Sequence, residues 1–251
     1  MVAVQKNILI KKIPPVRGSL QCDYPISQST WFRVGGNAQI LFEPADAEDL
    51  SEFLLRLDES IPLTVIGAAS NLLVRDGGIP GVTVRLGKPF SGVCPQKNGF
   101  EVIASGSAIG VKVSRAAQKS GISGLEFLSG IPGTVGGAIR MNAGAFGSEM
   151  SEVLTQAKAV NRKGEILTFE RDEMDFDYRH NGCPNDLIFI SAIETPFLKK
   201  FIIPLFIVSF ILLALVPIIG IEVKGAKRWI DFYFFRIQPI ELMKPFFILT
   251  T

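Results

Sequence analysis

The stretch SGLEFLSGIPGTVGGAIRMNAGAFGSE, residues 123–149, decides the fold. Its glycines leave the backbone bare, so the chain can take positive φ angles and its amide N–H groups can approach a ligand closely. Consecutive N–H groups in such turns form a concave anion site, and phosphate is the expected guest. Two shorter glycine-rich segments precede it, WFRVGGNA at 31–38 and VIGAASNLLVRDGG at 65–78. One such segment alone is more often a tight turn, but three in order favour a shared ligand.

The segment 65–78 suits the pyrophosphate of a dinucleotide. A strand runs into a turn of small residues that carries Ser70 and Asn71, whose side chains can hydrogen-bond phosphate oxygens. Neither G-x-G-x-x-G nor G-x-x-x-x-G-K-[ST] occurs there, so this interpretation does not depend on a dinucleotide fingerprint or a P-loop.

The elements before the long stretch follow a β-α-β rhythm, which is typical of an α/β or α+β domain. Alternating apolar residues predict strands, and a helix is predicted where Asp46 stands before an amphipathic run. The expected strands are 38–44, 62–67 and 81–86, and the expected helix is 46–57.

A second set of elements lies around and after the long stretch. The pattern predicts a strand in 99–107, a helix over 108–121 that Gly121 ends, two strands around a turn in 153–174, and a buried strand in 187–198. Two lobes are therefore expected, residues 29–95 and residues 96–198, after a leader at 1–28.

The sequence changes character after Lys199 and Lys200. A mean hydropathy of +0.32 is high for a soluble domain, and residues 201–221 carry no charge over the length of one bilayer crossing. An apolar transmembrane helix is predicted there, and a buried core helix or pair of strands is the alternative. If the two lysines mark the cytoplasmic side, the first two hundred residues are cytoplasmic.

Several classes of function are excluded by composition. A net charge of +2 without basic runs gives no reason to expect nucleic-acid binding. Three widely spaced cysteines, without a C-x-x-C pattern, indicate reduced thiols rather than disulfides or zinc ligands. The single histidine, His180, excludes a multi-histidine metal site, so no metal is expected. The first residues show no signal-peptide pattern.

Four motifs together resemble the family of UDP-N-acetylenolpyruvoylglucosamine reductases. They are STWFRVGG at 29–36, IGAASNLLVRDGG at 66–78, GLEFLSGIPGTVGGAIRMNAGAFGSE at 124–149 and DYRHN at 177–181, in the family's order and spacing. The resemblance implies an α+β fold with a two-lobed FAD-binding region of the vanillyl-alcohol oxidase type. It also implies a reaction of peptidoglycan precursor synthesis: NADPH reduces the flavin, and the hydride passes to UDP-N-acetylglucosamine enolpyruvate, which gives UDP-N-acetylmuramate.

The same resemblance implies the roles of individual residues. Gly67–Asn71 would lie on the pyrophosphate, Gly130–Gly137 would run past the isoalloxazine and ribityl chain, and Asn142–Gly144 would continue that wall. The implied cofactor-binding residues are Gly67, Ala68, Ala69, Ser70, Asn71, Gly130, Ile131, Pro132, Gly133, Thr134, Gly136, Gly137, Asn142, Ala143 and Gly144.

Tyr178 and Arg179 match the family's catalytic arginine motif, so both are expected at the substrate and Arg179 is expected to be catalytic. A fixed guanidinium suits the chemistry because hydride addition to an enolpyruvyl group builds enolate-like charge. The alternative is a surface arginine paired with Asp175 or Asp177.

Two departures from the family stand out. Ala69 occupies a position where the family usually has glycine, and if that position needs positive φ, alanine strains the loop by roughly a kcal/mol or more. The family continues into a third domain with a serine proton donor and an assisting glutamate, and no counterpart is recognised after Leu198. Turnover by this chain is therefore expected to be impaired.

Residues 220–245 resemble a different family, the polytopic cell-division and rod-shape peptidoglycan glycosyltransferases, through KGAKRWI at 224–230 and QPIELMK at 238–244. A short loop with Arg228 and Trp229 is expected between two apolar segments. Three functions stay open: a truncated and impaired reductase, a membrane-tethered flavin-binding remnant or gene-fusion product, and a different flavin oxidase of the superfamily.

Overall fold

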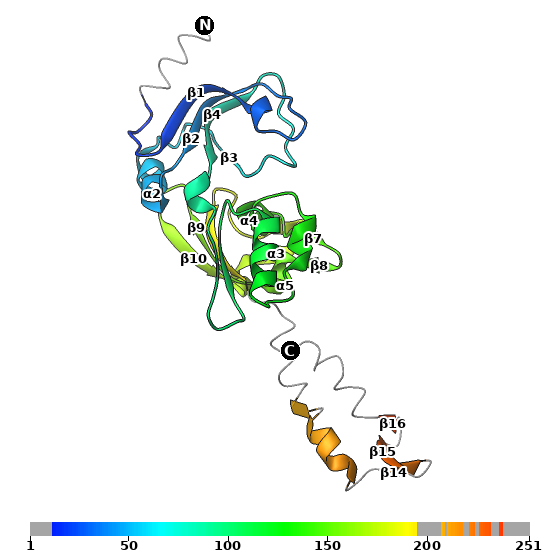
Figure 1. The fold of residues 1–251 in the computed structure, drawn as a ribbon. Helices are drawn as coiled ribbons and strands as arrows, with labels where there is room; N and C mark the ends of the chain where they lie inside the picture. The colour runs from blue at the N-terminus through cyan, green and yellow to red at the C-terminus, as the bar shows by residue number, and fades with distance from the viewer. Residues whose placement is uncertain are drawn as a thin grey trace. The chain divides into compact units, whose positions relative to one another are not determined.

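The computed structural model describes residues 12–194, 207–208, 210–217, 221–223, 226–231 and 236–237 (Figure 1). The chain divides into two units, Met1–Pro196 and Phe197–Thr251. The first unit holds both lobes, and the predicted sites all belong to it.

Lobe 1 is built on a four-stranded sheet. Its strands lie in the order β1 (Ser19–Pro25), β2 (Asn37–Glu43), β4 (Ile79–Arg85) and β3 (Leu63–Ile66). β4 runs parallel to both β2 and β3, and α2 (Ala47–Arg56) makes the crossover between β2 and β3. The side chain of Asp46 caps α2 by accepting from the N–H of Asp49 at 2.8 Å. These elements confirm the predicted β-α-β rhythm.

The predicted leader at 1–28 is wrong in its last ten residues. β1 pairs antiparallel with β2 at the sheet edge, and the 3-10 turn η1 (Ile26–Gln28) buries Ile26 completely. The sequence allowed one short helix or strand in this region without placing it, because most side chains of β1 are exposed and lack the apolar alternation of a half-buried strand.

Lobe 2 is built on a five-stranded antiparallel sheet. The strands lie in the order β10 (Ile166–Glu170), β9 (Leu154–Val160), β13 (Ile188–Glu194), β6 (Val102–Ser105) and β5 (Val93–Pro95). The predicted lobe boundary at residue 96 is therefore too late, because β5 already pairs with β6. The short turn η2 (Lys88–Phe90) precedes β5.

Helices and two small hairpins surround this sheet. The helical elements are α3 (Gly110–Lys119), η3 (Glu126–Gly130), α4 (Val135–Arg140), α5 (Met150–Val153) and η4 (Arg171–Met174). Gly121 takes φ +67° just after α3, as expected of a helix-ending glycine. The hairpins are β7 (Gly144–Ala145) with β8 (Ser148–Glu149), and β11 (Phe176–Asp177) with β12 (His180–Asn181).

A shared core holds the two lobes together. Phe42 and Phe53 of lobe 1 lie with ring centroids 4.2 Å apart, and their cluster includes Val160 and Ile188 of lobe 2. Figure 1 shows α2 beside β9 and β10 at this junction. A second cluster packs α3, η3 and α4 against the lobe 2 sheet. Because interiors are close-packed, the glycine-rich loops are attached to fixed supports.

The second unit is described only in part. Residues 207–208 and 210–217 are helical, and β14 (Ile221–Val223), β15 (Ala226–Asp231) and β16 (Arg236–Ile237) pair antiparallel. The loop expected around Arg228 and Trp229 is wrong, since both belong to β15. Much of the span predicted over 201–221 lies outside the described residues. Within the described part of the chain, no helix has the length and apolarity needed to cross a membrane.

Candidate active site

The loop after β3 is held in an unusual backbone conformation. Ala69 has φ +50° and is buried, so the position does require positive φ, as the departure from glycine implied. Its carbonyl accepts from the N–H of Trp31 at 3.4 Å, which joins the first glycine-rich segment to the second. Non-glycine residues at positive φ store strain and cluster at functional sites.

The loops of the two lobes touch one another. The Ser70 hydroxyl of lobe 1 donates to the carbonyl of Pro132 in lobe 2. A Cβ on Gly67 would lie 2.7 Å from Oγ1 of Thr134, which itself caps α4 by accepting from the N–H of Gly137 at 3.3 Å. A hydroxyl has one proton to donate. In this structure the Ser70 hydroxyl makes a bond between the lobes, and the phosphate role predicted for it stays a prediction.

The third contact lies within the long glycine-rich stretch. A Cβ on Gly130 would lie 2.5 Å from Cε2 of Phe146, so a side chain at position 130 would displace the Phe146 ring. Phe146 sits between β7 and β8 with φ +55°, and 85% of its surface is exposed. A large aromatic ring that is both exposed and held by a strained backbone is suited to contact a ligand.

The fourth contact joins this stretch to the Tyr-Arg motif. Asn142 donates from Nδ2 to the carbonyl of Asp177 at 3.2 Å and accepts at Oδ1 from the N–H of Ser151 at 2.9 Å. Its side chain is buried and occupied by these two bonds, so a contact of Asn142 with the cofactor, as predicted for 142–144, would come from its backbone. Ala143 and Gly144 are half-buried and exposed, respectively, and remain candidates for that wall.

Tyr178 and Arg179 form the two-residue turn between β11 and β12. Both side chains are exposed, and the Arg179 guanidinium lies 5.5 Å from the centre of the Tyr178 ring. Arg179 has φ +54°. Among the described residues it forms no ion pair, so the alternative of a surface pair with Asp175 or Asp177 is wrong. The guanidinium remains available to an anion.

A continuous series of contacts thus joins the four predicted motifs, although they come from both lobes. The contacts run from Trp31 to the Ala69 loop, from there to Pro132, on to the hairpin of Phe146, and by Asn142 to the turn of Arg179.

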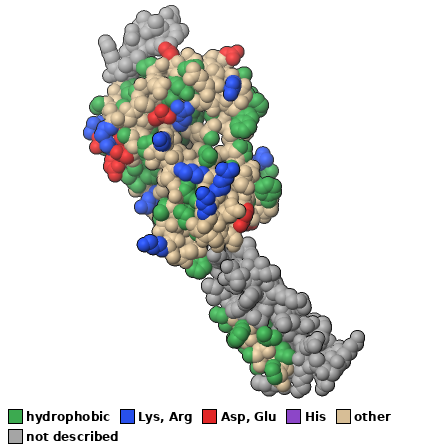
Figure 2. All heavy atoms as spheres, viewed as in Figure 1, with side chains coloured by type: hydrophobic (Ala, Val, Ile, Leu, Met, Phe, Trp, Pro, Cys, Tyr) green, Lys and Arg blue, Asp and Glu red, His purple; other side chains and the backbone are tan. Residues whose placement is uncertain are grey.

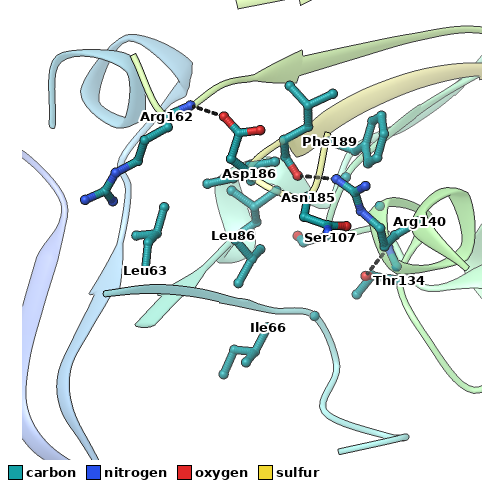
Figure 3. Close-up of a pocket in the computed structure, with 17 residues that line it drawn as sticks. Leu63, Ile66, Leu86, Ser107, Thr134, Arg140, Arg162, Asn185, Asp186 and Phe189 are labelled. Atoms are coloured by element: carbon teal, nitrogen blue, oxygen red, sulfur yellow. Dashed lines mark hydrogen bonds between the residues drawn. The ribbon is translucent and has the colours of Figure 1, made fainter. Parts of the chain in front are cut away.

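A cavity of about 310 Å³ lies beside these loops, between β3 of lobe 1 and the start of β13 (Figure 3). Leu63, Ile66 and Leu86 line one side. The cavity is also lined by four residues of the predicted site: Gly67, Thr134, Gly136 and Gly137. Other lining residues were not predicted from the sequence, namely Ser107, Arg140, Arg162 and Asn185–Phe189. Asn185–Phe189 gave no sequence signal, because they form the end of a loop and the first residues of β13, as in any ordinary strand.

Arg140 supports the wall of this cavity. It donates to the carbonyls of Cys183 at 3.1 Å, Pro184 at 2.9 Å and Leu187 at 2.9 Å, and its guanidinium lies 5.1 Å from the Phe189 ring centre. Burial lowers its pKa, although the group stays cationic because arginine titrates far above neutrality. Figure 3 shows Arg140 and Arg162 on opposite sides of the cavity.

The charges around the site favour an anionic ligand. On the face of the first unit shown in Figure 2, Lys and Arg side chains gather where the two lobes meet. Within the described residues, His, Cys, Asp and Glu form no group that could hold a metal ion.

Family models match two parts of the chain. The model described as FAD binding domain matches residues 38–170, which is more than half of the chain. The model described as cell cycle protein matches residues 185–251. The second match begins ahead of β13, so a central strand of the lobe 2 sheet falls within it.

Curated relatives carry one name, UDP-N-acetylenolpyruvoylglucosamine reductase. The protein from Parvibaculum lavamentivorans is 49% identical over 193 residues, covering 77% of this chain and 62% of its own length. The protein from Methylorubrum populi is 53% identical over 181 residues, covering 71% of this chain and 58% of its own length. The chain thus spans about three fifths of these relatives.

Solved structures show the same fold. A UDP-N-acetylenolpyruvylglucosamine reductase from Thermus caldophilus superposes with TM-score 0.59 at 28% identity, over 74% of this chain and 66% of that one. An oxidase of 6-hydroxy-D-nicotine from Arthrobacter nicotinovorans gives TM-score 0.53 at 14% identity, over 80% of this chain and 50% of that one. The latter is a likeness of fold alone.

Proposed function

This chain belongs to the family of FAD-binding domains, and we propose that it binds FAD between its two lobes as part of a UDP-N-acetylenolpyruvoylglucosamine reductase. Bound FAD would supply the hydride transfer, from NADPH to the enolpyruvyl group of UDP-N-acetylglucosamine enolpyruvate. The product would be UDP-N-acetylmuramate, a precursor of peptidoglycan.

One observation carries the proposal: glycine-rich loops from the two lobes come together, with Gly67 against Thr134 and Ser70 against Pro132. Gly67 lies so close to the Thr134 hydroxyl that a Cβ would not fit, so the backbone of the loop after β3 is bare at this junction. Backbone N–H groups can then reach a pyrophosphate directly. In this arrangement Gly67–Asn71 hold the pyrophosphate, and Gly130–Gly137 with Ala143 and Gly144 lie along the isoalloxazine and ribityl chain.

The cavity is the natural place for the adenosine half of FAD. It adjoins Gly67, and Leu63, Ile66 and Leu86 give it an apolar side against which a planar base can pack. At its rim one carboxylate oxygen of Asp186 accepts from the N–H of Arg162 at 3.0 Å. The other oxygen is left to accept from a ribose hydroxyl or the adenine amino group.

Arg179 is the residue proposed to act on the substrate. Hydride addition to the enolpyruvyl double bond puts negative charge on the substrate's carboxylate and the adjacent carbon. A fixed guanidinium stabilises that charge better than water because it need not reorient as the charge develops. Tyr178 lies against Arg179 and would share the substrate contact.

A second candidate function rests on the match of residues 185–251 to the cell cycle protein family. On the basis of this match, the second proposal is a membrane-tethered flavin-binding protein. In it, Lys199 and Lys200 lie on the cytoplasmic side and residues 201–221 anchor the chain. Its catalytic module would then be cytoplasmic and impaired in turnover. Alkaline carbonate extraction of membranes tests this proposal: a chain released into the supernatant contradicts the anchor, and a chain that stays in the pellet supports it.

The reductase function is tested with the full chain, purified in detergent and loaded with FAD. NADPH added without oxygen should bleach the flavin absorbance, and UDP-N-acetylglucosamine enolpyruvate should then restore it. Restoration by the UDP-sugar supports the reductase. Bleaching without restoration supports the impaired flavin-binding protein, and restoration by oxygen alone favours an oxidase.

A further inference from the structure

The turn that carries Arg179 is small and exposed. Its hairpin has only two residue pairs, Phe176 with Asn181 and Asp177 with His180. A hairpin of this size is not stable by itself in water. The position of the turn must therefore be fixed by contacts from outside the hairpin.

Two asparagine side chains connect the hairpin to neighbouring parts of lobe 2. Asn181, fully buried, donates from Nδ2 to the carbonyl of Ile139 at 2.8 Å, which ties the end of β12 to α4. Asn142 donates to the carbonyl of Asp177, the residue directly before the Tyr178–Arg179 turn. The two contacts hold the strands on either side of the turn, each two residues from Arg179.

The side-chain oxygen of Asn142 makes a second contact, to α5. Its Oδ1 accepts from the N–H of Ser151, in α5, and its own backbone follows α4 with φ +39°. One short side chain therefore connects the glycine-rich stretch, α5 and the hairpin. Asparagine suits the position because it tolerates left-handed φ and carries both a donor and an acceptor.

We propose that Asn142 is a positioning residue for Arg179. Its two hydrogen bonds hold the turn that carries the guanidinium in a fixed position relative to the loop that lies along the cofactor. This rests on the proposed function, since Arg179 is assigned there. It adds a role for the Asn142 side chain to the cofactor wall that the resemblance implies for 142–144.

The test uses the full chain and the variants Asn142→Gly and Asn142→Asp. Glycine accepts the positive φ without cost but removes both hydrogen bonds, so it separates the side chain's role from the backbone's. Aspartate keeps the acceptor for Ser151 and loses the donor to Asp177. Asn98→Gly is the matched control, because Asn98 also bonds through both ends of its side chain but lies in the β5–β6 turn.

Three quantities are measured in each variant: FAD affinity, amide hydrogen exchange over residues 177–181, and reoxidation of the NADPH-reduced flavin by UDP-N-acetylglucosamine enolpyruvate. For Asn142→Gly we expect FAD affinity within about threefold of wild type and faster exchange at 177–181. Reoxidation should slow by roughly 10²-fold, the order that a displacement of about 1 Å costs a catalytic group. Asn142→Asp should show the same changes, and Asn98→Gly should show none.

Unchanged exchange at 177–181 in Asn142→Gly would overturn the proposal, and so would faster exchange with wild-type reoxidation. A general loss of FAD binding in Asn142→Gly would also overturn it, since that outcome means a structural role in the cofactor site. If the wild type itself binds no FAD, the proposed function fails and the assignment to Arg179 falls with it. The exchange comparison still reports whether Asn142 holds the hairpin.

Discussion

Gly67 and Thr134 approach so closely across the two lobes that a Cβ on Gly67 would lie 2.7 Å from the Thr134 Oγ1. The same hydroxyl caps α4 through the N–H of Gly137. Any side chain at position 67 must therefore push against a cap that supports the loop of lobe 2. This contact therefore links the geometry of the two loops.

Replacing Gly67 by alanine should weaken FAD binding by about tenfold or more, a cost of about 1.4 kcal/mol, because Thr134 must move and its cap is lost. Quenching of flavin fluorescence on titration measures the affinity. Gly77→Ala is the control, since a Cβ at Gly77 meets nothing within 4 Å. Equal affinities for the two variants would contradict the close fit.

Ala69→Gly should stabilise the protein. Alanine at φ +50° costs about 1–2 kcal/mol that glycine does not, and the extra flexibility of glycine in the unfolded chain offsets part of it. We expect a net gain of about 0.5–1 kcal/mol in the free energy of unfolding, measured by urea denaturation. Ala68→Gly, at a neighbour without positive φ, should give no gain. A loss of stability in Ala69→Gly would refute the strain.

Arg179→Ala should separate cofactor binding from substrate reduction. FAD affinity and the rate at which NADPH bleaches the flavin should stay within about threefold of wild type. Reoxidation by the UDP-sugar should fall by roughly 10²–10³-fold, the usual cost of removing one group that stabilises charge in a transition state. Arg115→Ala, an exposed arginine on α3, is the control. Stopped-flow absorbance follows both steps, and unchanged reoxidation would exclude Arg179 from the chemistry.

Glu194 should make stability depend on pH. It is fully buried, accepts no hydrogen bond within the described part of the chain, and burial raises its pKa from 4.5 to about 8. Between those values the folded state keeps a proton that the unfolded chain releases, so the free energy of unfolding falls as pH rises from 4.5 to 8. A tenfold difference in proton affinity between the two states corresponds to about 1.4 kcal/mol, so the expected loss is on the order of a few kcal/mol.

Glu194→Met tests this directly, because it fills the site without a polar group. The variant should gain more stability over wild type at pH 8 than at pH 5, as thermal denaturation at the two values reports. Glu152→Met, at an exposed glutamate, should show no such difference. A gain that is equal at both pH values would show that the carboxyl does not titrate in this window.

The features of the fold that depend on local sequence could be predicted. Asp46 indicates the start of α2, and Gly121 indicates the end of α3. Ala69 was expected to be strained if its position required positive φ, and its φ is +50°. β1 could not be placed because an exposed edge strand has no apolar alternation, and β5 was missed because it has three residues. Contacts across the chain, such as Ser70 with Pro132 and Asn142 with Asp177, were out of reach because they depend on how the lobes pack.

The most direct test of the account is the visible absorption spectrum of the full chain after incubation with FAD and removal of free flavin by gel filtration. FAD binding between the lobes predicts a yellow protein that carries about one flavin per chain, with Gly67→Ala carrying less. A folded protein that emerges colourless, and does not quench flavin fluorescence on titration, would contradict the central claim.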